Sequence, residues 1–234
     1  YVAVAINVAV AAGGLVIASI TNYKPVDSME NDPGVRRASG AVSVYIVIAL
    51  SGFTALAAEV VWTRLLSLLF GATTYTFSLI LAVFLFGLGI GSTVGSAMAS
   101  RVARPRLALG WCQLALCACM AWTAWVVSQS LPYWPINPSS VQNPWINFQV
   151  DLVRALFAVL PAAILWGASF PLALAAVAAR GQDPAKLVGS VYAANTVGAI
   201  IGSLGASLVL VAWIGSLHTM QTLIVVAAIA GAIL

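Results

Sequence analysis

The sequence has 234 residues, of which 62% are hydrophobic and only 7% are charged. Soluble domains carry about 25% charged residues, so this composition excludes an ordinary water-soluble domain. The net charge of +4 does not indicate nucleic-acid binding, because most basic residues lie in short connections between apolar runs. Runs of about 20 apolar residues, which is the length that crosses a bilayer, recur along the chain. We therefore expect an all-α, polytopic transmembrane helix bundle in contact with lipid.

Seven hydrophobic spans are expected in chain order. They cover residues 2–20, 42–70, 75–100, 107–128, 152–179 and 188–214, with a last span from about residue 217. The first and last spans are similar in their Ala/Val-rich texture, and parallel six-helix repeats recur among transporters. We expect residues 1–20 to be the last helix of a preceding unit, 21–40 a cytoplasmic loop, and 41–234 a six-helix module. Both ends of the chain lie in apolar runs, which favours a fragment of a longer protein.

Basic residues are confined to alternate connections between the spans. One set of connections holds Lys24, Arg36, Arg37, Arg101, Arg104, Arg106, Arg180 and Lys186, whereas those at 71–74, 129–150 and about 215 hold none. Lys and Arg are enriched in cytoplasmic loops of membrane proteins. The first set, including the loop with Arg101, Arg104 and Arg106, is therefore expected to be cytoplasmic. The Tyr1 end would lie outside and the Leu234 end inside.

Four charged side chains inside spans are candidate functional residues, because a charge in hydrocarbon is costly. They are Glu59, Arg64, Asp151 and Arg154. Asp151 and Arg154 are three residues apart and can share a helix face. Glu59 and Arg64 are five apart, roughly 140° around a helix, so each is expected to have a partner elsewhere. One interpretation is an ion-pair network between the two helices, and the other is a site at Glu59 for a cationic substrate or a proton.

Two glycine patterns predict close helix packing. Small residues four apart let two membrane helices approach until their backbones touch. The pattern occurs in two spans, at Gly87, Gly91 and Gly95 and again at Gly198 and Gly202. We interpret all five as helix-packing residues.

Polar and proline residues in two later spans leave two readings open. Tyr192, Asn195 and Thr196 place polar groups in the inner part of span 188–214. They either make hydrogen bonds between helices or line a cavity. Pro161 and Pro171 remove backbone donors from span 152–179, and a helix broken there would line a cavity.

The sequence contains no constellation typical of catalysis or metal binding. Cys112, Cys117 and Cys119 lie in one apolar run and are interpreted as small packing residues, since structural zinc sites need paired ligands in a suitable loop. The single histidine, His218, is expected at an outer helix start. We predict no catalytic residue, no metal and no cofactor in this chain.

Three stretches carry a resemblance to a known family. SGFTALAAEVVWTRLLSLLFGATTYTFSLILAVFLFGLGIGS (51–92), GASFPLAL (167–174) and VGSVYAANTVGAIIGSLGAS (188–207) resemble motifs of bacterial membrane proteins known as fused major-facilitator/spermidine synthase proteins. The loop after Gly95 is similar to the basic motif of major-facilitator halves. Arg101 and Arg104 match that motif, while Ser100 and Ala103 replace its acid and its glycine.

This resemblance implies a major-facilitator-like six-helix unit in a bacterial inner membrane, with the Tyr1 end periplasmic. It also implies a cytoplasmic spermidine synthase-like domain in the same protein, whose activity would be aminopropyl transfer. The expected function is a transporter-like module that handles polyamines or anchors that domain. The other hypothesis is a structural subunit that packs with further membrane subunits through its glycine-rich faces, without transport or catalysis.

Overall fold

The computed structural model describes residues 2–20, 40–71, 74–134, 143–179 and 182–234. The chain divides into two compact units, Tyr1–Arg36 and Arg37–Leu234. The described part of the first unit is α1 (Val2–Ile20), an apolar helix. Apart from Gly40, the expected cytoplasmic loop 21–40 lies outside the described residues.

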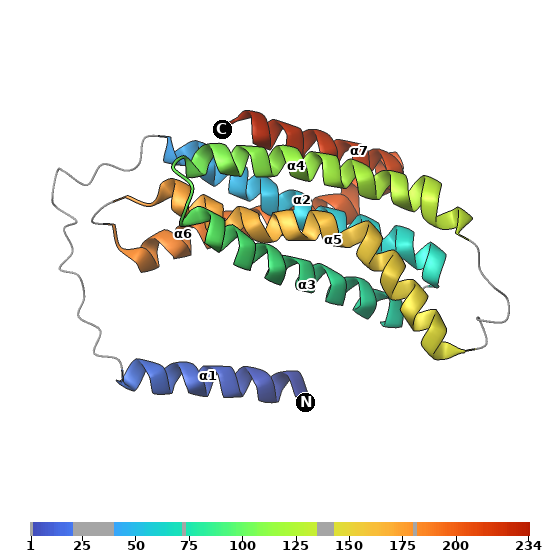
Figure 1. Cartoon of the computed structure of the whole chain (residues 1–234), viewed down its shortest axis with the longest axis horizontal. Coiled ribbons are helices and arrows are strands. Elements are labelled where there is room, and N and C mark those ends of the chain that lie inside the picture. Colours follow the sequence, from blue (N-terminus) through green and yellow to red (C-terminus); the bar gives the residue numbers. More distant parts are fainter. Residues whose placement is uncertain (1, 21–39, 72–73, 135–142, 180–181) are drawn as a thin grey trace. The chain divides into compact units, whose positions relative to one another are not determined.

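In the described part of the second unit, six α-helices lie side by side along one long direction (Figure 1). They are α2 (Ala41–Phe70), α3 (Thr74–Ala99), α4 (Pro105–Trp125), α5 (Pro144–Val177), α6 (Pro184–Gly205) and α7 (Val211–Ala232). Two short segments, η2 (Val126–Ser130) and η3 (Leu131–Tyr133), prolong α4, and η4 (Ala206–Leu210) joins α6 to α7. Within the described residues every element is a helix, which confirms the all-α class.

Five helical stretches in the described part of the chain are long and apolar enough to cross a membrane. Seven were expected. One reason for the difference is that α6, η4 and α7 form a single stretch of 49 residues, Pro184–Ala232, with no loop between them. Within it, Gly215 has a φ of 77° and a ψ of 168°, so the helical geometry is interrupted at that residue. The helix α1, which is 19 residues long and apolar, is also not among these five.

The helices α5 and α6 begin several residues earlier than expected, each at a proline. α5 starts at Pro144 rather than at 152, and the Asn143 side chain accepts a hydrogen bond of 3.0 Å from the backbone N–H of Trp145. α6 starts at Pro184 rather than at 188, capped in the same way by Asp183. Asn or Asp before a proline is a helix-start signal, because proline lacks the N–H that a first turn leaves unpaired.

The two prolines inside α5 do not break it. The helix continues through Pro161 and Pro171 as far as Val177. The interpretation of a broken helix at these residues is therefore wrong for the structure as described.

Close backbone contact joins α3 to α5. Gly87, Gly91 and Gly95 are buried on the face of α3 that packs against α5. A Cβ atom added at Gly91 would overlap the backbone oxygen of Ile164, and one at Gly95 would meet the backbone of Ala168. Because glycine has no side chain, the two helix backbones touch directly along about two turns.

The same kind of contact joins α2 to α6. Gly198 and Gly202 are buried, and a Cβ on either would overlap the backbone of Ala49 or Phe53 respectively. From the opposite side, Gly52 of α2 lies against the backbone of Asn195. Two further helices of the unit are α4, which packs on α5 and α7, and α7, which also contacts α2; in addition, α2 contacts α5. The unit thus contains two glycine-packed helix pairs, α3 with α5 and α2 with α6.

Replacing Gly91 by alanine should destabilise the bundle by about 1–3 kcal/mol, because the added methyl group has no space against Ile164. Gly89 is the matched control, since it lies on the same helix with nothing within 4 Å of an added Cβ. Gly89→Ala should leave stability unchanged or slightly higher. Thermal unfolding of both variants in detergent checks this, and equal melting temperatures for the two would refute the close contact between α3 and α5.

Candidate functional site

A groove of about 270 Å³ lies among α2, α3, α5 and α6. Its lining residues are Ser51, Gly52, Ala55, Leu56, Phe84, Leu88, Ser92, Trp166, Gly167, Phe170, Tyr192 and Asn195. Both glycine-packed pairs therefore contribute to it. A mostly apolar concave site with a few polar groups is typical of small-molecule binding.

Aromatic side chains form much of the groove wall. The indole N–H of Trp166 donates a hydrogen bond of 3.2 Å to the Thr54 hydroxyl, which fixes the ring. Trp166 packs against Phe84, with 5.8 Å between ring centroids, and against Trp62, with 5.4 Å between ring centroids. Phe170 meets Tyr192 edge to face at 6.4 Å. Aromatic faces held in this way can bind an apolar group or, through their π electrons, a cation.

Two of the polar residues expected in span 188–214 line this groove. Asn195 is half-buried and Tyr192 is exposed, and both belong to its lining. Thr196 is half-buried but is not among the lining residues. For Tyr192 and Asn195, the structure therefore corresponds to the cavity-lining reading rather than to hydrogen bonds between helices.

Glu59 and Arg64 differ in their surroundings. Glu59 is half-buried, and it lies three and four residues beyond Leu56 and Ala55, so it continues the groove side of α2 by one turn. Arg64 is exposed. Within the described residues neither side chain makes an ion pair, and the one ion pair found joins two residues of α5. An ion-pair network between α2 and α5 is therefore absent from the part of the chain that the structure describes.

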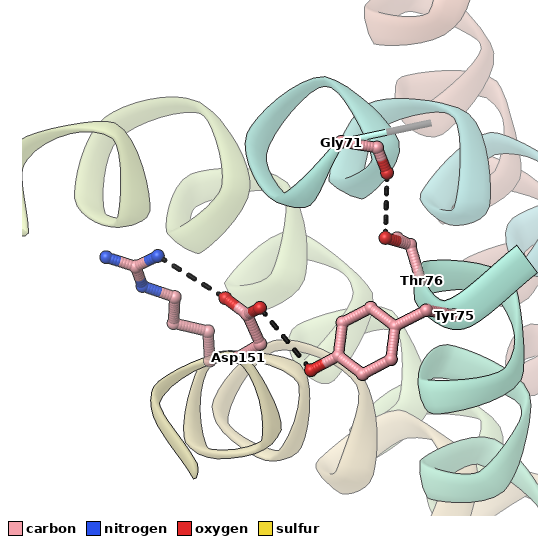
Figure 2. Close-up of polar contacts among 5 residues, drawn as sticks. Gly71, Tyr75, Thr76 and Asp151 are labelled. Atoms are coloured by element: carbon pink, nitrogen blue, oxygen red, sulfur yellow. Dashed lines mark hydrogen bonds and ion pairs between the residues drawn. The ribbon is translucent and has the colours of Figure 1, made fainter. Parts of the chain in front are cut away.

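Asp151 and Arg154 form that ion pair, at one end of the bundle (Figure 2). Arg154 Nη1 lies 3.6 Å from Asp151 Oδ1, and both side chains are largely buried. The Tyr75 hydroxyl of α3 donates a long hydrogen bond of 3.5 Å to Asp151 Oδ2, so the carboxylate links α3 and α5. Arg154 Nε is buried and has no partner among the described residues.

The start of α3 is held beside this ion pair. The Thr76 hydroxyl donates a hydrogen bond of 2.7 Å to the carbonyl oxygen of Gly71 (Figure 2). This bond joins the residue that follows α2 to the first turn of α3, beside Tyr75.

The basic loop of the sequence lies at the N-terminal end of α2. Arg106 Nη2 donates hydrogen bonds to the Gly40 carbonyl oxygen at 3.1 Å and to the Ser43 hydroxyl at 2.8 Å. Arg101 and Arg104 are exposed. Arg106 thus ties the start of α4 to the start of α2, while the other two arginines are accessible.

Gln113 of α4 is a polar residue that the sequence pattern did not single out. It is fully buried, and its Nε2 donates to the hydroxyls of Ser51, at 3.3 Å, and Ser169, at 3.0 Å. It therefore links α2, α4 and α5, and one of its partners, Ser51, lines the groove. The available signal in the sequence was an amide side chain in the middle of the apolar run 107–119.

No metal-binding group of His, Cys, Asp or Glu occurs among the described residues, and the three cysteines are free thiols. His218 is exposed on α7, with its Nδ1 3.0 Å from the Ile214 carbonyl oxygen. Comparisons with protein-family models, with curated proteins and with solved structures find no match for this chain. The groove, together with Glu59 one turn further along α2, is the candidate ligand-binding site.

Substituting Asp151 by asparagine should lower the free energy of unfolding by about 1–3 kcal/mol, because the largely buried Arg154 would lose its counter-charge. Tyr75→Phe removes only the long hydrogen bond and should cost less than about 1 kcal/mol. Denaturant titration in mixed micelles measures both. A Tyr75→Phe loss as large as that of Asp151→Asn would show that the ion pair does not stabilise this end of the bundle.

Proposed function

We propose that this chain is a membrane-integral, transporter-like module that binds a small organic cation in the groove among α2, α3, α5 and α6. The observation that carries the proposal is the groove itself, with aromatic walls and few polar groups. Its position inside a bundle of apolar, membrane-length helices supports the same class of function.

The proposed topology has seven crossings. A single helix of 49 residues would be about 74 Å long, whereas the hydrocarbon core is about 30 Å thick. Gly215 interrupts the helical geometry inside that stretch. We place one crossing before Gly215 and one after it, and we count α1 as a further crossing. From the distribution of basic residues we propose that Arg101, Arg104 and Arg106 lie in the cytoplasm and that the Tyr1 end lies on the other side of the membrane. The family resemblance favours a bacterial inner membrane, in which the Tyr1 end would be periplasmic.

A cationic ligand fits the groove better than an anionic one. Among the lining residues the polar groups are hydroxyls and an amide, with no basic side chain. Ring faces such as that of Trp166 attract cations. Glu59 supplies the nearest carboxylate along the groove side of α2, and no basic side chain in the described residues neutralises it.

A polyamine is the ligand that the sequence resemblance favours. The stretch 51–92, which contains part of the groove lining and Glu59, resembles fused major-facilitator/spermidine synthase proteins. We propose membership of that family, with a cytoplasmic spermidine synthase-like domain elsewhere in the same protein. The five helix-packing glycines of α3 and α6 are buried against other helices of this chain. A structural subunit would therefore have to contact further membrane subunits through surfaces other than these glycines.

Purified protein in lipid nanodiscs should bind radiolabelled spermidine, and Glu59→Gln should weaken that binding about tenfold, because the variant removes the carboxylate that attracts the cation. Arg64→Gln is the control, since it removes a nearby charge that is exposed. It should leave affinity unchanged or slightly higher. Equilibrium binding over a range of spermidine concentrations measures all three proteins.

Two results would count against the proposal in different ways. Absence of saturable spermidine binding by the unaltered protein would remove the polyamine-binding function. Equal affinity of Glu59→Gln and the unaltered protein would remove Glu59 from the mechanism while leaving the groove. Uptake into proteoliposomes then distinguishes a transporter from a module that only binds.

A further inference from the structure

Gln113 occupies a site where a polar side chain is costly. It is fully buried in α4, and its Oε1 has no hydrogen-bond partner among the described residues. An unpaired carbonyl oxygen in an apolar interior loses its hydration without compensation. A leucine, similar in size and apolar, would avoid that loss. Polar residues that lower stability in this way are expected mainly at functional sites.

The amide nitrogen of Gln113, unlike its oxygen, is hydrogen-bonded to two serine hydroxyls. Its Nε2 donates to Ser169 Oγ, and Ser169 in turn donates a hydrogen bond of 2.8 Å to the Leu165 carbonyl oxygen. Ser169 is therefore fixed on α5 and holds the amide in place. The second N–H of the amide donates to Ser51 Oγ at 3.3 Å.

Ser51 connects this buried cluster to the groove. It belongs to the groove lining and is at the same time the hydrogen-bond partner of Gln113. A hydroxyl has one hydrogen and two lone pairs. One lone pair of Ser51 Oγ accepts the Gln113 N–H, so a second lone pair and the hydrogen are left for a group bound in the groove that Ser51 lines.

We propose that Gln113 is a positioning residue that orients the Ser51 hydroxyl, so that its free lone pair accepts an N–H of a cation in the groove. This inference rests on the proposed function and adds a specificity determinant on a helix, α4, that does not line the groove. The chain Ser169–Gln113–Ser51 carries the orientation from α5 through α4 to α2.

The test combines stability with binding in the full chain. Gln113→Leu should raise the melting temperature, since it removes the unpaired oxygen, and should weaken spermidine binding about tenfold, since Ser51 loses its orientation. Ser51→Ala should weaken binding to a similar extent. The double variant should bind no more weakly than either single variant, because both act on one hydrogen bond to the ligand.

Thr123→Val is the matched control on the same helix. Thr123 is equally buried, but its hydroxyl is satisfied by the carbonyl oxygens of Cys119, at 3.0 Å, and Ala158, at 2.7 Å. Its replacement should lower the melting temperature and leave spermidine affinity unchanged, which is the opposite of the pattern expected for Gln113.

Each outcome decides a separate point. A lower melting temperature for Gln113→Leu, or unaltered affinity, overturns the positioning role while the groove function stands. Additive losses in the double variant also overturn it, because Gln113 would then act independently of Ser51. Failure of the unaltered protein to bind spermidine overturns the proposed function and the positioning role together.

Discussion

Direct contact between helix backbones is the constraint on which the described bundle depends. Where Gly91 meets Ile164 and Gly198 meets Ala49, no side chain separates the helices. In a bilayer the hydrophobic effect does not drive helices together, so this close packing has to supply much of the association energy. Because α3 is held on α5 and α6 on α2, residues of all four helices line one groove. The groove is the space that this pairing leaves.

Polar groups inside such a bundle are acceptable only where they have partners. Thr54, Thr123 and Ser169 each donate to a backbone carbonyl oxygen and so add contacts between or within helices. Two buried groups in the described part of the chain do not follow this rule, namely Gln113 Oε1 and Arg154 Nε. The first adjoins the groove through Ser51, and the second belongs to the ion pair with Asp151. The two buried side chains with an unpaired polar atom, Gln113 and Arg154, are therefore also residues with a proposed role beyond helix packing.

Much of the fold follows from composition and spacing, because hydrophobic runs and glycine repeats are local signals. The helices and the glycine faces were expected on that basis, and the Asp151–Arg154 pair followed from a three-residue spacing. The earlier starts at Pro144 and Pro184 were missed, since proline was treated as a loop residue and not as the first residue of a helix. Gln113 was missed because its importance depends on contacts with two other helices, which spacing along one helix does not reveal.

The central claim, that the groove is where the ligand binds, is tested most directly by chemical protection. A Ser92→Cys variant, in a background with the three native cysteines replaced, places a thiol on the groove lining. Val94→Cys places one on the exposed surface of the same helix, outside that lining. We predict that spermidine slows labelling by a small thiol reagent at position 92 and leaves the rate at position 94 unchanged. Equal rates with and without spermidine at position 92, in protein that binds spermidine, would contradict the account.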